Sequence, residues 1–429
     1  DVIKIIQSFH NFSFRQQNDY PDYLKKIFFY ESTMVYESKL NKKEDIIIFR
    51  NKICEAYSSA FKQDKLTVDD VYTEKWNKNE DYIFCTDFNN FNGDNPEMVK
   101  ELCFVNNKQT LMDFIKSKIE IFYRAKDIKN KNYIKITEQN LLYVIQILRN
   151  FEQNNQNLIL IGKEYTGKKN LFEVACFLAE IDIIEIDNTF FFNTKKTRAQ
   201  FISQIITPFL VNATHRNKRS ILYIPSSVTV SYVKETVIKL LDYKEIINNF
   251  IFIDIQNYGE ITEEETMDRL SKNISICFDL IPNSEEYTNI FSNYPSIAKS
   301  SNIVYFHSWK KEDLISFMGI NYAKLELKEE MQNNLPKIFI EIFNHTNAQY
   351  QTIKQKLGID IKLNQKNFCD VCEFFSSKYT EYKNILTERQ NKYNEAFTII
   401  DKVKELMERA NKDIEEANPK KAELDKFND

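Results

Sequence analysis

The chain has 429 residues, a formal net charge of −4, and a composition that is 43% hydrophobic and 14% aromatic. This apolar content is enough for packed cores, which excludes an intrinsically disordered chain, and the length predicts two to four domains. No basic excess and no apolar run of membrane-spanning length occurs, so neither nucleic acid nor a membrane is expected as a partner. The cysteines, seven in number and scattered, are typical of a reducing compartment.

The first part of the chain is predicted to be mainly helical, because apolar residues recur there at three- and four-residue spacing. Residues 81–95 differ: they contain the short apolar run YIFCTDF, bounded by polar residues, which indicates a strand or a connector. The spacing predicts helices at residues 3–9, 23–40, 46–61, 111–123 and 139–151.

The stretch LILIGKEYTGKKNLF, residues 158–172, combines a buried strand, a G-x-x-x-x-G-K loop and the start of a helix. This is the context of a phosphate-binding loop, in which glycines let backbone N–H groups point at an anion and the lysine reaches the outer phosphates. The chain has only six glycines, and two of them stand in this frame. The sequence therefore predicts a nucleotide site formed by Gly162, Lys163, Glu164, Tyr165, Thr166, Gly167, Lys168, Lys169 and Asn170.

The residues after the loop lysine depart from the motif. A Ser or Thr normally follows this lysine and holds Mg²⁺, but here Lys169 and Asn170 follow Lys168. We therefore expect ATP or ADP to bind weakly, without Mg²⁺, or not at all, and we expect no metal site. The four histidines are far apart, and Cys369-x-x-Cys372 has no second pair, so both cysteines are interpreted as structural thiols.

Beyond the loop, apolar strands and helices alternate, which predicts an α/β fold with a parallel sheet that is covered on both faces. Ligands of such sheets bind outside the carboxyl ends of the strands, where the loop falls. The strands are predicted at residues 181–186, 220–224, 274–280 and 303–306, and the helices at 199–210 and 232–241. The pattern becomes purely helical again at residues 311–322, 330–343 and from 365 onward.

The C-terminal stretch carries a heptad frame, interrupted only at Arg389 and Lys421, that predicts one strand of a coiled coil roughly 70 Å long. A single solvated helix is the alternative. We expect Pro419 to bend or loosen the helix. The chain begins with Asp1 and stops inside this repeat, so we expect it to be a piece of something larger. The seam consists of Tyr379, Tyr382, Leu386, Tyr393, Ala396, Ile400, Val403, Met407, Ala410, Ile414, Ala417 and Leu424.

This order of elements resembles the dynein heavy chain at its fourth AAA+ module, which leads into the outgoing helix of the microtubule-binding stalk. The similar segments are FFYESTMVYESKL (28–40), LLYVIQILRNFEQNNQNLILIG (141–162), FSNYPSI (291–297), YFHSW (305–309) and LTERQNKYNEAFTIIDKV (386–403). The resemblance implies a helical lid of the preceding module at 1–95 and an AAA+ large α/β subdomain with a degenerate nucleotide site at 96–310. It further implies a helical small subdomain at 311–375 and the outgoing stalk helix at 376–429.

The chain departs from this family at the residues that carry catalysis. Ser226, in ILYIPSSV, stands where the family has the Asp that holds the magnesium–water network. Where the family places arginines, the chain has Tyr287, Thr288, Asn289 and Ile290. Phosphoryl transfer relies on positioning and charge neutralisation. We therefore expect no catalytic residues and no hydrolysis in this module.

The resemblance implies that the chain is part of an ATP-driven, minus-end-directed microtubule motor that hydrolyses ATP elsewhere in its ring. The bias toward Asn, Lys, Ile and Phe, typical of AT-rich genomes such as those of ciliates, favours an axonemal heavy chain. The implied partners are the neighbouring AAA+ modules, the returning stalk helix, the microtubule through the stalk tip, and dynein light and intermediate chains. The implied location is the cytoplasm, the cytoskeleton and the axoneme of the cilium.

Two other classes of protein compete with this interpretation. An independent AAA+ switch or assembly ATPase with a coiled-coil partner arm would need its own acid and arginine finger, and Asp254 and Asp279, which end strand-like runs, are the best substitutes for the acid. A purely structural coiled-coil protein is disfavoured by the α/β core. Further AAA+ modules and an antiparallel return helix in the rest of the gene would favour the dynein.

Overall fold

The computed structural model divides into two compact units, Asp1–Asp313 and Leu314–Asp429, and each is described by itself. The domain boundaries expected from the sequence stay predictions. The structure describes residues 20–37, 40, 43–61, 66–68, 71, 83–86, 102–105, 108–127, 134, 136–152, 157–164, 166–186, 197–228, 230–241, 261–309, 311–322, 325–358 and 364–428. The helix predicted at 3–9 lies outside these residues.

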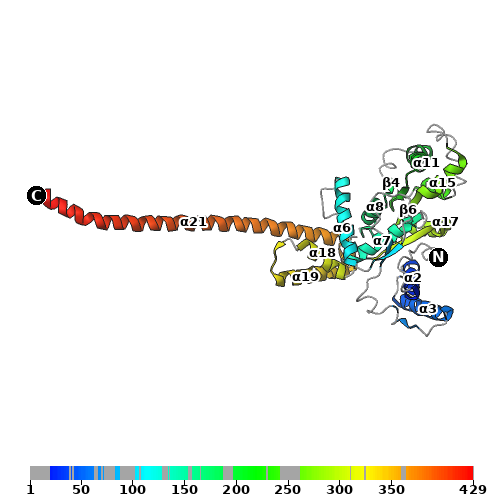
Figure 1. Ribbon diagram of the computed structural model, residues 1–429, viewed down its shortest axis with the longest axis horizontal. Coiled ribbons are helices and arrows are strands. Elements are labelled where there is room, and N and C mark those ends of the chain that lie inside the picture. The colour runs from blue at the N-terminus through cyan, green and yellow to red at the C-terminus, as the bar shows by residue number, and fades with distance from the viewer. Residues whose placement is uncertain are drawn as a thin grey trace. The chain divides into compact units, whose positions relative to one another are not determined.

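A five-stranded parallel sheet forms the centre of the first unit (Figure 1). Its order is β4-β5-β6-β3-β7, and each neighbouring pair is parallel. The α/β fold with a parallel sheet is thereby confirmed. All five strands end at the same edge, so the loop after the fourth strand in this order, β3, meets the ends of its neighbours. The strands are β3 (Asn157–Gly162), β4 (Asp182–Glu185), β5 (Ser220–Ile224), β6 (Ile274–Leu280) and β7 (Ser301–Phe306).

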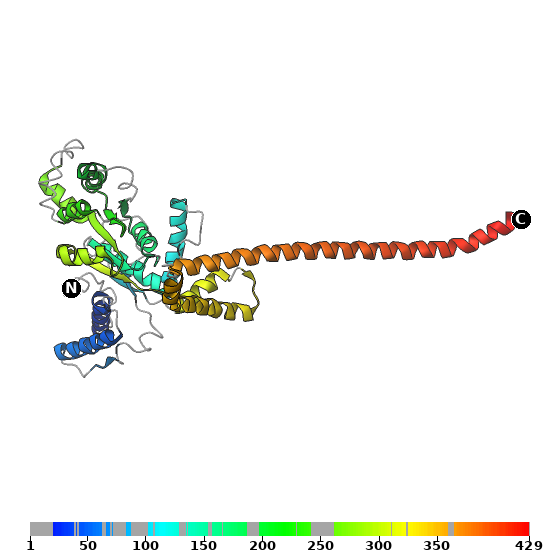
Figure 2. The same cartoon turned by 180° about the vertical axis from the view of Figure 1, so that it is seen from behind.

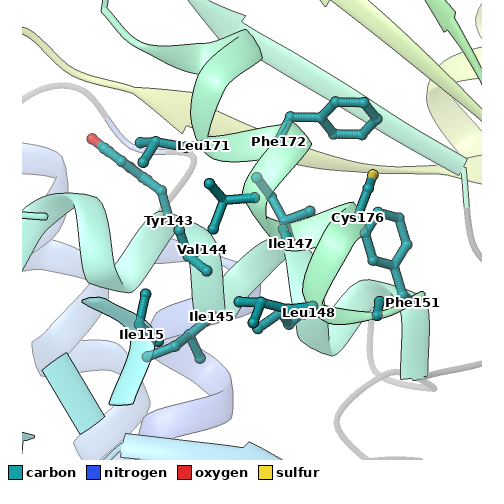
Figure 3. Packing of buried hydrophobic residues seen from close by; sticks show 14 of the residues in the cluster. Ile115, Tyr143, Val144, Ile145, Ile147, Leu148, Phe151, Leu171, Phe172 and Cys176 are labelled. Atoms are coloured by element: carbon teal, nitrogen blue, oxygen red, sulfur yellow. The ribbon is translucent and has the colours of Figure 1, made fainter. Parts of the chain in front are cut away.

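Alternating side chains of β3 supply both faces of the sheet, as the two-residue period of a strand requires. Leu158 and Leu160 belong to one buried cluster, and Ile159 and Ile161 to a second. The first cluster also takes in α6 (Lys108–Ala125), α7 (Glu138–Glu152) and α8 (Lys168–Leu178). Figure 3 shows the packing of Leu171, Phe172 and Cys176 with Val144, Ile147, Leu148 and Phe151.

Helices between the later strands cover the second face of the sheet. Thr262 and Ser284 cap two of them by accepting hydrogen bonds from backbone N–H groups three residues on. The helix predicted at 199–210 contains the π turn η4, which was not predicted. The wider turn brings Ile206 to the same side as Phe201, and both are buried. These elements are α10 (Arg198–Phe201), η4 (Ile202–Ile206), α11 (Thr207–Thr214), α12 (Ser231–Leu240), α15 (Glu263–Asn273), α16 (Glu285–Asn293) and α17 (Pro295–Ser300).

The N-terminal part of the first unit contains α2 (Tyr20–Val35), α3 (Lys43–Phe61) and an antiparallel strand pair, β1 (Ile83–Thr86) with β2 (Leu102–Val105). Strand β2 was not predicted, and α2 ends earlier than the expected residue 40. A small aromatic core holds the two helices together, in which Phe29 and Tyr57 are buried with ring centroids 5.2 Å apart.

The second unit consists of α18 (Lys311–Tyr322), which begins just before it, α19 (Glu329–Ala348), α20 (Tyr350–Leu357) and α21 (Gln365–Asn428). Phe317, Phe368 and Cys372 are among its buried residues. Burial raises the pKa of the Cys372 thiol to about 12, so the thiol stays protonated. Cys372 is thus part of a hydrophobic core.

Helix α21 runs unbroken for 64 residues, and Figures 1 and 2 show its single continuous course. It continues through Pro419, where we expected a bend or a loosening, and the ribbon curves near its C-terminal end. Apolar seam residues along its outer part are exposed to solvent; Met407, for example, is 61% exposed. Tyr379 is half-buried and stacks on Phe375. Of the helices that the structure describes, none has both the length and the apolar character that crossing a membrane requires.

Candidate nucleotide site

The loop between β3 and α8 has glycines at two positions where the backbone requires them. A Cβ atom at Gly162 would lie 2.7 Å from the Cβ atom of Phe306 and 2.9 Å from its carbonyl oxygen, so only glycine allows this approach of β7. Gly167 has a φ of 85°, in the left-handed region that favours glycine, and stands directly before α8. The Thr166 hydroxyl donates to the Lys163 carbonyl over 2.9 Å. Both glycines of the motif are therefore required by geometry.

The remaining loop residues differ in exposure. Lys163 and Glu164 are exposed, Asn170 is half-buried, and Thr166 is buried. Tyr165 lies outside the described residues. The role of these residues in holding phosphate stays a prediction.

Lys168 is buried beneath the loop and is only 5% exposed. Its Nζ atom lies 2.7 Å from the carbonyl oxygen of Gly162, 3.0 Å from that of Leu280, and 2.5 Å from Oδ1 of Asp279. A lysine ammonium has three N–H donors. Three protein oxygens thus lie within hydrogen-bonding or ion-pairing distance of this group.

Asp279 owes its position to the strand order. It lies near the end of β6, beside Leu160 of β3, so its carboxylate reaches the lysine that follows the loop. The hydroxyl of Tyr223, on β5, donates to Oδ2 of Asp279 over 2.9 Å. Burial, and next the charge of Asp279, raise the pKa of Tyr223 far above its ordinary value, so the hydroxyl remains a donor. The carboxylate is therefore held from two sides.

Lys169 extends further along the sheet edge, past β6 and toward β4. Its Nζ atom lies 2.7 Å from both carboxylate oxygens of Glu185, at the end of β4, and 5.9 Å from the centroid of the Tyr223 ring. Glu173 lies 4.0 Å from the same ammonium, and burial raises the pKa of its carboxyl group. A cation thus occupies the position whose hydroxyl would hold Mg²⁺.

The structure places the other altered positions on separate elements. Ser226 lies half-exposed in the turn after β5, and Tyr287, Thr288, Asn289 and Ile290 lie on α16. Asp254 lies outside the described residues. In the part of the chain that the structure describes, His, Cys, Asp and Glu form no group of three or more that could hold a metal. Because Lys169 stands where the motif has its metal-binding hydroxyl, the loop lacks that ligand for Mg²⁺.

Sequence reasoning missed two members of this cluster, Tyr223 and Glu185, and considered Asp279 only as a substitute acid. All three lie at or near the carboxyl ends of predicted strands, where ligand sites of parallel sheets form. Their position at these strand ends could therefore have marked them as candidate site residues. Which strands are neighbours, however, depends on pairing between distant parts of the chain.

Comparison with known proteins identifies the family of this chain. Residues 134–377 match the family model of the P-loop containing dynein motor region D4. The chain is similar to dynein axonemal heavy chain 2 of Mus musculus, with 20% identity over 306 residues, and to its Homo sapiens counterpart, with 19% identity over 309 residues. Each match covers 66% of this chain and 7% of the relative, so the chain spans a small part of these proteins. The model match extends over more than half of the chain, which therefore belongs to the P-loop containing dynein motor region D4 family.

Proposed function

We propose that this chain is the module of a dynein heavy chain that binds nucleotide without hydrolysing it and links the AAA+ ring to the stalk. One observation carries the proposal: the loop has glycines where its geometry requires them, as a phosphate-binding loop does, while Lys169 stands in place of the metal-binding hydroxyl. Backbone donors and the N-terminus of α8 form an anion site that needs no metal. ATP or ADP is the ligand proposed for it.

The parent protein is proposed to be an axonemal, ATP-driven, minus-end-directed microtubule motor of the cytoskeleton and cilium. The family match and the axonemal relatives support this proposal. Its partners are proposed to be neighbouring AAA+ modules, light and intermediate chains, and the microtubule through the stalk tip.

Helix α21 is proposed to be the outgoing helix of the stalk. Its seam residues Tyr393, Met407 and Leu424 are each more than 60% exposed, and most helical stability comes from packing such an apolar face. We propose that an antiparallel helix from a later part of the same heavy chain covers this seam.

Nucleotide binding is expected to depend little on Mg²⁺. Calorimetric titration of the 429-residue chain with ADP and with ATP, each with Mg²⁺ and with EDTA, measures this directly. The dissociation constants should differ by less than about threefold between the two conditions, because the retained phosphate ligands are backbone amides. Gly167→Val, which strains the left-handed turn, should abolish binding. If neither nucleotide binds at millimolar concentration, the proposal of a nucleotide site fails.

Hydrolysis by this chain is expected to be undetectable. Ser226→Asp alone should restore little, because Lys169 and the residues in place of the arginines remain. A coupled phosphate-release assay on the wild-type chain and on Ser226→Asp tests this. Steady-state turnover by the wild-type chain would contradict the proposal and favour an independent AAA+ ATPase.

A further inference from the structure

Asp279 forms an ion pair with Lys168, the cation that an outer phosphate of a nucleotide would contact. In phosphate-binding loops, backbone amides cradle the inner phosphates and the lysine reaches the β- and γ-phosphates. Here the Lys168 ammonium faces the Gly162 and Leu280 carbonyl oxygens and the Asp279 carboxylate. The two carbonyl oxygens accept hydrogen bonds from the ammonium, and the carboxylate lies 2.5 Å from it as an ion pair. A phosphate that approaches Lys168 therefore competes with the Asp279 carboxylate for the same cation.

Of the three groups around Lys168, the Asp279 carboxylate is the one that repels a phosphate most strongly, because both are negatively charged. Asp279 is 13% exposed, and two like charges in a partly desolvated site repel each other more than in water. The carboxylate is also tethered, because Tyr223 donates to its second oxygen over 2.9 Å. Each added phosphate charge near Lys168 therefore meets a fixed negative group.

We infer that Asp279 is an internal competitor for Lys168 that makes the site select nucleoside diphosphates over triphosphates. The inference rests on the proposed function, since it requires that the loop bind nucleotide. A diphosphate can be held by the backbone amides and the N-terminus of α8. A triphosphate brings a further phosphate to the outer end of the loop, where Asp279 has already neutralised the lysine.

The test is calorimetric titration of the full chain with ADP and with ATP in EDTA, at one fixed ionic strength because salt screens such repulsion. The wild-type chain should bind ADP more tightly than ATP. Asp279→Asn should tighten ATP binding by about tenfold and ADP binding by less. The control is Asp268→Asn, which removes the same charge from an exposed pair with Lys272 on α15 and should change neither constant.

Asp279→Asn leaves the buried Lys168 without its counter-ion, so thermal unfolding of the variant has to be measured first. Tyr223→Phe provides a second route, because it keeps every charge and the packed ring but removes the tether on Asp279. It should shift the ATP-to-ADP affinity ratio in the same direction by about twofold.

The outcomes separate the two claims. An unchanged ATP-to-ADP ratio in both variants, with nucleotide still bound, overturns the role of Asp279 and leaves the nucleotide site standing. Absence of binding by wild-type and variant chains overturns both. Binding by Asp279→Asn alone supports the inference, because it shows that the carboxylate blocks a competent loop.

Discussion

Replacing Arg149 by Met should lower the free energy of unfolding by about 3–5 kcal/mol. Arg149, on α7, forms a buried ion pair with Glu31 of α2, and its guanidinium lies 5.4 Å from the Tyr30 ring centroid. The two side chains are only 8% and 3% exposed. Removal of the arginine takes the Arg149 charge away from the buried Glu31 carboxylate. Urea denaturation followed by circular dichroism measures the change.

The double variant Arg149→Met with Glu31→Leu should recover most of this loss, since a buried ion pair can be replaced by apolar groups with little change in stability. Lys272→Met is the control, because Lys272 and its partner Asp268 are both more than half exposed. Its effect should stay within about 0.5 kcal/mol. A loss below about 1 kcal/mol for Arg149→Met would show that this pair does not join α2 to α7 in solution.

Phe172→Ala should cost about 3–5 kcal/mol of unfolding free energy, because it opens a cavity in the centre of the first unit. The side chain is fully buried, and its ring centroid lies 5.2 Å from that of Tyr223 and 6.4 Å from that of Phe151. Figure 3 shows Phe172 among the clustered residues of α7 and α8. Native-state hydrogen exchange of the β3 and β5 amides localises the loss to this sheet.

Phe177→Ala is the matched control on the same helix. Phe177 is half-buried and makes an edge-to-face contact with Phe122 at 5.4 Å. The surrounding residues and solvent can fill the space it leaves, so its cost should be clearly smaller than that of Phe172→Ala. Equal effects of the two variants would contradict the central position assigned to Phe172.

The regular parts of the sheet could be predicted from the sequence because local patterns specify them. The strands at Ser220–Ile224 and Ile274–Leu280 and the helix at Lys311–Tyr322 have the predicted bounds. Each is an apolar run or a helical repeat, so the spacing of its own residues is enough to reveal it. The two glycines of the loop could likewise be recognised from their spacing.

Features that depend on distant parts of the chain could not be predicted. The contact between Lys168 and Asp279 joins residues more than a hundred positions apart and exists because β3 lies beside β6. Strand β2 is short, and its place in a sheet depends on pairing with β1, which lies earlier in the chain. The π turn within 202–206 follows from how Phe201 and Ile206 meet the sheet, and helical spacing alone does not reveal it.

Helix α21 is long enough to act as a lever. Beyond Tyr379 it continues to Asn428, which at 1.5 Å per residue corresponds to about 75 Å. If this length moves as a rigid rod, a rotation of about 5° at its base displaces the far end by roughly 6.5 Å, slightly more than one helical pitch. Near the base, Phe375 of α21 contacts the Phe339 ring of α19 with centroids 5.4 Å apart, and such a rotation displaces these rings far less than the far end. A rotation too small to repack that base is therefore sufficient to shift the far end by about one turn of helix.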